Sequence, residues 1–137
     1  MINSNLKIYS VLICFIFLLI PNFNDAKEIL IYADDISYDE DKNIIARGNA
    51  KIFQGEQLII SELIIYEKNN NKIILPTSFT LKDKNDNYFK AESGFFENDL
   101  EFGEFENVKI RLNDGSRIIG NKVKRKGHID IISKGVY

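Results

Sequence analysis

The chain has 137 residues, of which 45% are hydrophobic, and its formal net charge is -2. One domain fits this length, and the hydrophobic fraction is enough for a packed core, which excludes a wholly disordered chain. The near balance of 18 basic and 20 acidic residues gives no electrostatic reason to expect nucleic acid as a partner.

The N-terminal segment has the pattern of an export signal. Lys7 precedes an apolar run at residues 8–20, and a short polar stretch follows. The run is shorter than the roughly 20 apolar residues that a spanning helix needs, so we expect a signal peptide over residues 1–26, cleaved after Ala26. The alternative is that the segment stays and anchors the domain in the inner membrane. The single cysteine, Cys14, lies in this run, so no disulfide or cysteine metal site is expected in the exported part.

Beyond residue 26 the chain alternates between apolar strands and polar turns, with no helical period. The expected strands are residues 29–33, 44–53, 58–66, 73–82, 88–96, 100–112 and 117–126, with a short one at 129–133. About eight short strands separated by turns predict an all-β sandwich or roll. Pro76 falls inside one of them, which predicts an edge strand or a bulge at that point.

The strands also repeat. Three eight-residue segments align at a constant step of 29 positions, at 45–52, 74–81 and 103–110. Such self-similarity predicts stacked units, none of which buries its apolar face alone. Stacks of this kind leave long grooves and unpaired ends, which favour binding over catalysis. A second set of pairs repeats beside the first, at Ala33-Asp34, Ser61-Glu62, Ala91-Glu92 and Gly120-Asn121.

Strand parity gathers small and apolar residues on one face. Small residues leave volume between two layers, and phenylalanines from the opposite layer can fill that volume or leave it for a ligand. The sequence therefore permits a filled core or an apolar trough for acyl chains. The candidate trough residues are Ile44, Ala46, Ala50, Ile52, Phe79, Leu81, Phe89, Phe95, Phe105, Val108, Ile110 and Ile118.

Three lysines alternate along one expected strand. Lys122, Lys124 and Lys126 share a face, and Arg125 lies on the opposite one. Such lysines can guard a sheet edge against aggregation. They can also contact lipid phosphates or the acidic residues of a partner, and the sequence leaves both readings open.

Catalytic and metal-binding patterns are weak. The only histidine, His128, lies in the C-terminal tail and is expected to be exposed. The acidic run at residues 34–41 lacks the glycine and terminal glutamate of a calcium loop and reads as a solvated turn. A sugar hydrolase needs two convergent carboxylates, whereas Glu62, Glu92 and Glu104 lie on outward or unassigned faces. We therefore predict no enzyme, no metal site and no cofactor.

Several segments in order carry a resemblance to a known family. They are residues 33–39 (ADDISYD), 45–52 (IARGNAKI), Gln54-Gly55 and 105–118 (FENVKIRLNDGSRI). Over residues 29–137 the chain resembles the OstA-like, LptA-type domain of lipopolysaccharide transport proteins, and within that group the N-terminal periplasmic domain of LptD. The resemblance implies a β-jellyroll of repeated antiparallel strands, with an open apolar groove that carries lipid A acyl chains. It also implies end-to-end joining to other jellyroll proteins of the transport system by edge-strand pairing.

These readings define the expected organisation and function. We expect a jellyroll domain at residues 27–126 and a C-terminal tail at 127–137, which resembles a truncation because an LptD continues into a cysteine pair and a barrel. The implied function is a periplasmic lipopolysaccharide-binding module at the outer membrane, with a separately encoded barrel as a further partner. The alternative is a structural adaptor that joins jellyrolls by strand addition and holds no lipid.

Overall fold

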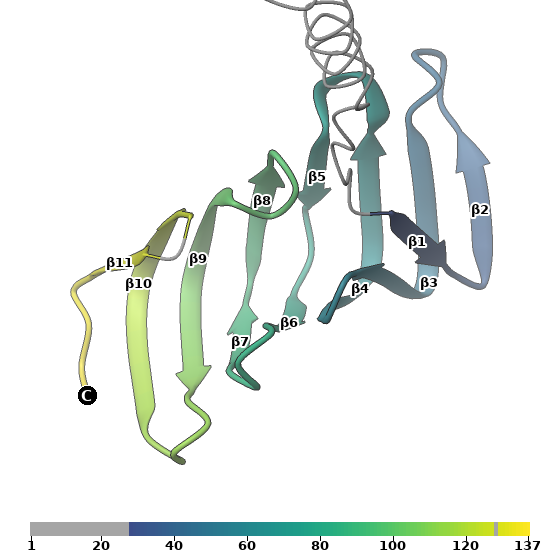
Figure 1. Cartoon of the computed structure of the whole chain (residues 1–137). Helices are drawn as coiled ribbons and strands as arrows, with labels where there is room; N and C mark the ends of the chain where they lie inside the picture. Colours follow the sequence, from purple (N-terminus) through teal and green to yellow (C-terminus); the bar gives the residue numbers. More distant parts are fainter. Residues whose placement is uncertain (1–27, 128) are drawn as a thin grey trace, which may run out of the picture.

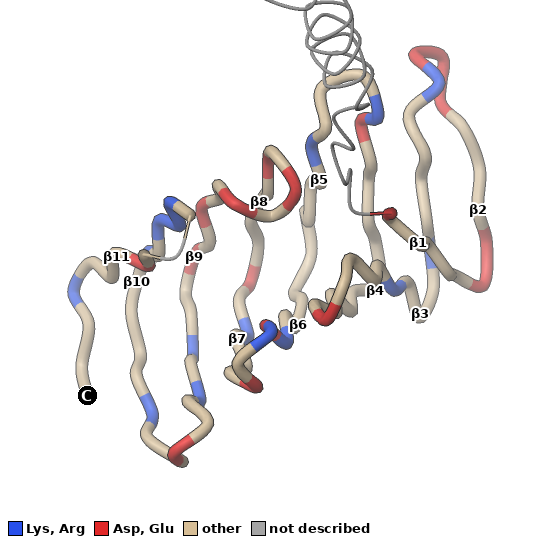
Figure 2. Tube along the Cα trace, viewed as in Figure 1, with Lys and Arg blue, Asp and Glu red and all other residues tan. Residues whose placement is uncertain are grey.

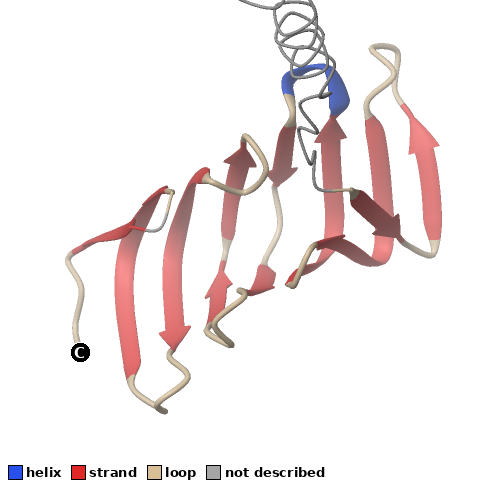
Figure 3. Cartoon of the chain, in the orientation of Figure 1, coloured by secondary structure: helices blue, strands red, loops and turns tan. Residues whose placement is uncertain are grey.

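The computed structural model describes residues 28–127 and 129–137, which form one 11-stranded antiparallel sheet folded over on itself (Figure 1). The predicted signal peptide and His128 lie outside the described residues. A single 3-10 turn, η1 (Lys68–Asn70), connects β4 and β5 (Figure 3). The strands are β1 (Ile29–Tyr32), β2 (Asp35–Tyr38), β3 (Ile44–Gln54), β4 (Gln57–Glu67), β5 (Lys72–Leu75), β6 (Phe79–Lys82), β7 (Tyr88–Ala91), β8 (Ser93–Glu97), β9 (Phe102–Arg111), β10 (Arg117–Lys126) and β11 (Ile129–Ser133).

Four long strands give the roll its two layers. Each of β3, β4, β9 and β10 runs through both layers. β3, β4 and β9 change neighbours halfway along, whereas β10 pairs with β9 throughout and with β11 over residues 122–126 only. Layer 1 consists of β2, β5, β8 and β11 with the adjoining halves of the long strands. Layer 2 consists of β1, β6 and β7 with the other halves, which are the lower halves in Figure 1. The predicted fold, an antiparallel all-β jellyroll, is thus confirmed.

The 29-residue repeat has a structural cause, because it marks the corners where the chain passes between layers. Asn49 and Asn107 both adopt left-handed backbone, with φ of 47° and 51°. The Asn49 side-chain amide donates to the carboxylate of Asp34 at 2.7 Å, and that of Asn107 donates to Glu92 at 2.6 Å. Asparagine tolerates this conformation better than most residues. The two corners are therefore built in the same way from residues in the same repeat positions.

The expectation that Pro76 marks an edge strand or a bulge is wrong, because Pro76 lies in the middle corner. Residues 73–82 form two strands, β5 and β6, and Pro76 lies in the break between them. Both strands have neighbours on both sides, so the proline marks neither an edge nor a bulge. Its missing N–H falls where the ladder is interrupted in any case. The Ser61 hydroxyl lies 3.1 Å from both the Thr77 hydroxyl and the Ser78 carbonyl oxygen, which ties β4 to this corner.

The core lies between the layers and is rich in phenylalanine. Phe79, Phe96 and Phe105 are at most 2% exposed. The ring centroids of Phe96 and Phe105 are 4.7 Å apart, and Phe79 meets Phe105 edge-on at 5.8 Å. Aromatic pairs at these separations add favourable contacts to the gain from burial. The centre of the roll is accordingly filled by its own side chains.

The two ends of the roll leave strand edges unpaired among the described residues. At one end β1 and β2 each pair only with β3, and at the other β11 pairs only with β10. The short strand expected at residues 129–133 is present as β11, and Val136 adds a two-bond bridge to Ile119. Most of the segment assigned to the tail therefore continues the sheet.

Candidate functional site

Most of the candidate trough residues lie together between the layers. Nine of them are between 0% and 3% exposed: Ala46, Ala50, Ile52, Phe79, Leu81, Phe89, Phe105, Val108 and Ile110. All nine belong to one buried hydrophobic cluster, so their side chains pack against one another rather than line open space. These nine positions form the buried centre of the space between the layers, which we call the slot, rather than its open surface.

The remaining three candidates lie elsewhere. Ile44 and Ile118 are half-buried, near opposite ends of the strand order. Phe95 lies on the outer face of layer 1, where the Lys72 ammonium sits 4.4 Å from its ring centroid. The neighbouring Phe96 points inward in its place. Successive side chains on a strand point to opposite faces, so one of two adjacent phenylalanines must point inward. Alternation alone does not say which one, because both are apolar.

The open space between the layers is at the end formed by β1 and β2. A cavity of about 680 Å³ lies there, which we call the N-terminal mouth. Its walls come from β1, β2, β3 and β4, and Lys68, Asn71 and Asp99 add polar groups. The apolar and aromatic residues that line it are Ile29, Ile31, Ile36, Tyr38, Ile44 and Tyr66.

Sequence reasoning missed most of the N-terminal mouth: Ile29, Ile31 and Tyr66 lie in expected strands but were not assigned to the trough, and β2 was not predicted at all. Only Ile44 was among the candidates. The signal was present, since Ile36 and Tyr38 alternate with Asp35 and Ser37 in a period of two. The alternating run is only four residues long and lies between two acidic turns, so it was assigned to the turns.

A polar contact closes the gap between the layers beside this mouth. The Gln54 side-chain amide, at the end of β3 in layer 2, donates to the Asp99 carboxylate at 3.0 Å. Asn71 donates to the same oxygen at 3.1 Å from the layer 1 side. Asp99 and Leu100 have φ of 58° and 64°, and Leu100 is only 3% exposed. The β8–β9 turn thus carries a strained backbone that places one side chain in the core and one across the gap.

Tyr66 connects this contact to the mouth. Burial, and secondarily the negative charge of Asp99, raise the pKa of the Tyr66 hydroxyl above its ordinary value. Both effects disfavour the phenolate. Tyr66 therefore stays a neutral wall residue of the mouth across the physiological range.

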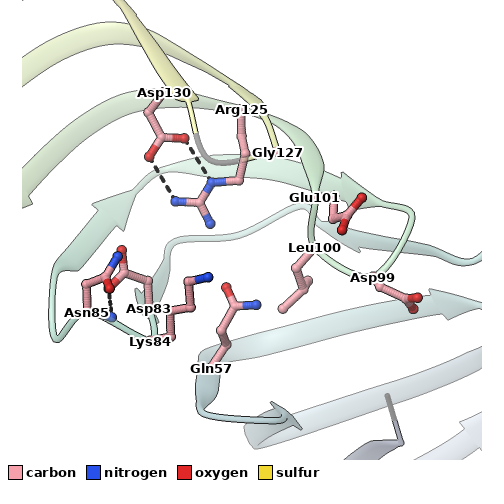
Figure 4. A pocket seen from close by; sticks show the side chains of 10 residues that line it. All are labelled: Gln57, Asp83, Lys84, Asn85, Asp99, Leu100, Glu101, Arg125, Gly127 and Asp130. Carbon is pink, nitrogen blue, oxygen red and sulfur yellow. Dashed lines mark hydrogen bonds and ion pairs between the residues drawn. The ribbon is translucent and has the colours of Figure 1, made fainter. Parts of the chain in front are cut away.

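A buried ion pair lies near the β10–β11 end of the strand order. Arg125 is 7% exposed, and its guanidinium donates to both carboxylate oxygens of Asp130 on β11, at 2.9 and 3.0 Å (Figure 4). The guanidinium carbon lies 5.0 Å from the ring centroid of Phe89 and 5.7 Å from that of Phe105. A polar cavity of about 110 Å³ lies beside the pair. This cavity is smaller and more polar than the N-terminal mouth, and Asp99 lines both.

The three alternating lysines lie on the outer face of layer 1, and Arg125 projects inward as predicted. Glu104 accepts from Lys122 at 2.6 Å and from Lys124 at 3.1 Å. These hydrogen bonds, Lys122 first, lower the pKa of the Glu104 carboxyl, and Glu104 in turn raises the pKa of Lys122. Lys126 is exposed and forms no ion pair within the described part of the chain.

The three carboxylates considered for hydrolysis do not face one another. Glu62 is exposed, Glu92 holds a corner asparagine, and Glu104 is held by lysines on the outer face. Within residues 28–127 and 129–137 no cluster of three or more histidine, cysteine or acidic side chains is arranged to hold a metal ion. Over the same residues no helix has the length and apolar character to cross a membrane.

Comparison with known proteins places the fold. No protein-family model matches the chain, and no curated protein sequence matches it. Among solved structures it is similar to LptH from Pseudomonas aeruginosa, described as the LptA homologous periplasmic component of the conserved lipopolysaccharide transport device. The TM-score is 0.64 at 14% identity, over 77% of this chain and 82% of that chain. At this identity the likeness shows a shared LptA-like fold.

Proposed function

We propose that this chain is a periplasmic lipopolysaccharide-binding module that takes lipid A acyl chains into the N-terminal mouth. The observation that carries the proposal is the largely apolar cavity of about 680 Å³ between the layers at the end formed by β1 and β2. Its size falls in the range of roughly 300–1,000 Å³ found for small-molecule sites. The fold shared with a periplasmic component of lipopolysaccharide transport supports the same assignment.

The energetics favour recognition of the tails. Each methylene removed from water contributes about 0.8 kcal/mol, so six methylenes in the mouth contribute about 5 kcal/mol. An exposed ion pair to a head group contributes up to about 1 kcal/mol. Lys68 and Asn71 line the mouth and offer a cation and an amide to a phosphate-bearing head that remains in water.

Partners follow from the unpaired edges. In the proposal, β1 and β2 at one end and β11 at the other accept edge strands of other jellyroll proteins of the transport system. Lys122, Lys124 and Lys126 lie next to β11, far along the strand order from the mouth, so we assign them to an acidic partner rather than to the lipid head. The resemblance to the N-terminal domain of LptD extends the proposal to assembly at the outer membrane with a separately encoded barrel.

One observation favours a second function, a structural adaptor that holds no lipid. The centre of the slot is filled, with Phe79, Phe96 and Phe105 at most 2% exposed. A roll filled in this way can join its neighbours by strand addition without carrying anything between its layers.

Substitution of the mouth separates the two functions. Ile36 is 45% exposed and lines the mouth, so Ile36→Asp places a charge in the cavity without opening the core. Ile131 on β11 is 51% exposed and makes a matched control as Ile131→Asp. The readout is crosslinking of lipopolysaccharide or displacement of a fluorescent acyl probe, with circular dichroism to verify folding.

The lipid-binding proposal requires a loss of roughly tenfold or more in affinity for Ile36→Asp, because a charge in an apolar site carries a large desolvation cost. The control should bind as the parent protein does. Equal binding by both variants, or no binding by the parent protein, overturns the lipid assignment and leaves the adaptor.

A further inference from the structure

The outer face of layer 2 has an unusual charge pattern. The layer 2 segments of the strands are β1, β6 and β7 with residues 50–54, 57–61, 108–111 and 117–120, and they contain no aspartate or glutamate. Figure 2 shows basic residues on the lower halves of β9 and β10, with an acidic residue only in the turn that joins them. The cations of these segments, which we call the basic face, are Lys51, Lys82, Lys90, Lys109, Arg111 and Arg117.

This pattern is local, because the chain as a whole has a net charge of -2. On layer 1 the basic residues alternate with acidic ones and pair with them, as Lys72 does with Glu97 and Lys122 with Glu104. On the basic face only Lys82 forms an ion pair with a described residue, through Asp86 in the adjoining turn. The other five cations are exposed and have no carboxylate partner within the described residues.

Exposed apolar side chains lie among these cations. Tyr32 is 56% exposed, Ile119 54%, and Leu30 and Ile60 are also exposed, all pointing outward from layer 2. Tyr88 holds the Arg111 guanidinium 4.7 Å from its ring centroid. A depression of about 340 Å³ on the same face is lined by Tyr88 and Ile119 together with Lys90, Lys109, Arg111 and Arg117.

We infer that the basic face docks on an anionic lipid bilayer, with the cations on phosphate head groups and the apolar side chains at the head-group level. Lysine and arginine near an anionic membrane surface each favour binding, and aromatic and aliphatic side chains add to it at the interface. The inference concerns a surface outside the slot and does not rest on the proposed function.

The distribution of the cations favours a bilayer over an acidic protein as the occupant. They are spread across β3, β6, β7, β9 and β10, which are most of the strands of layer 2, rather than gathered around one pocket. A broad sheet face with cations and apolar groups interspersed matches a surface of many equivalent anions. A single acidic segment would contact only a part of it.

The test compares two charge-matched variants of the full chain. One is Lys90→Gln/Lys109→Gln/Arg117→Gln on the basic face, and the other is Lys122→Gln/Lys124→Gln/Lys126→Gln on layer 1. Sedimentation with vesicles of phosphatidylcholine, with and without phosphatidylglycerol, measures binding. The apolar run at residues 8–20 is common to all three proteins, so the reported quantity is the ratio of binding to anionic and neutral vesicles. The single variant Arg117→Gln provides the measurement if the triple variant does not fold.

The parent protein should favour anionic vesicles, and added salt should weaken that preference. The basic-face variant should lose the preference by roughly tenfold or more, and the layer 1 variant by much less. Equal losses in both variants, or no preference in the parent protein, overturn the inference. Binding to soluble polyglutamate without binding to anionic vesicles also overturns it, in favour of an acidic protein partner.

Discussion

The ion pair between Arg125 and Asp130 gives the sharpest stability prediction. The substitution Asp130→Asn removes the charge that neutralises a guanidinium only 7% exposed. Breaking a buried pair by removing one partner costs about 3–5 kcal/mol, because the remaining charge is left without compensation. The Asp130 side chain is 25% exposed, so water reaches this site in part and the cost falls to about 2–3 kcal/mol.

A second substitution should reverse most of this loss. Arg125→Met removes the stranded charge and leaves an unbranched side chain against Phe89 and Phe105, which Arg125 now covers. The double variant Arg125→Met/Asp130→Asn is expected within about 1 kcal/mol of the parent protein, since neither charge is left uncompensated and the partly exposed side chain at position 130 can hydrogen-bond with water.

Equilibrium urea unfolding followed by far-ultraviolet circular dichroism measures both effects, and the slope of the transition shows whether unfolding remains two-state. The chain has no tryptophan, so fluorescence offers a weaker signal. A loss below about 0.5 kcal/mol for Asp130→Asn would refute the reasoning. That result would mean that the guanidinium finds water or another acceptor, and that Asp130 is not needed to compensate its charge.

Three further predictions concern a corner, a surface carboxylate and the wall of the mouth. Asn107→Ala should lower the free energy of unfolding by about 1–2 kcal/mol, because φ is 51° and the bond to Glu92 is lost, whereas Asn107→Gly should cost less; urea unfolding compares them. Glu104 has a lowered pKa in the fold, so its stabilising effect should be present above the ordinary value of 4.5 and disappear as pH falls through the folded value; Glu104→Gln should abolish this pH dependence in unfolding curves. Tyr66 has a raised pKa, so its contribution is present below the ordinary value of 10.0 and is lost as pH rises through the folded one. Asp99→Asn should bring the pKa of Tyr66 partly back toward that value in an ultraviolet titration, since burial, the larger cause, remains.

The sequence predicts strand content and corners better than it predicts layers. The alternation of polar and apolar residues identified the long strands, and the same alternation placed Arg125 opposite the three lysines. The 29-residue step was visible in the sequence because the corners recur at it, with Asn49 and Asn107 at the same position of the first and third corners, two steps apart. The sequence did not reveal that each repeat marks a change of layer. Periodicity shows that a segment recurs, but it does not show which way the chain turns there.

The candidate site was only partly predictable for a related reason. Parity selects the inward face of a strand, and nine trough candidates do lie inward. Whether an inward position is packed or open depends on the side chains opposite, which are distant in sequence. Ile36 and Tyr38 line the mouth because β2, among the described residues, pairs with β3 alone and is an edge strand. Phe95 and Phe96 give a second example. The register of β8 against β5 and β9 determines which of the two rings points inward, and the sequence does not give that register.

The repeated corner has an evolutionary consequence. Because each crossing is built from its own local hydrogen bonds, a tandem duplication of about 29 codons would insert another crossing between existing ones and lengthen the roll without redesigning its termini. The two extremities could then diverge under separate selection while the interior grew. A small protein of this architecture is in that sense extensible, and the length of its roll is set by copy number more than by the identity of any one side chain.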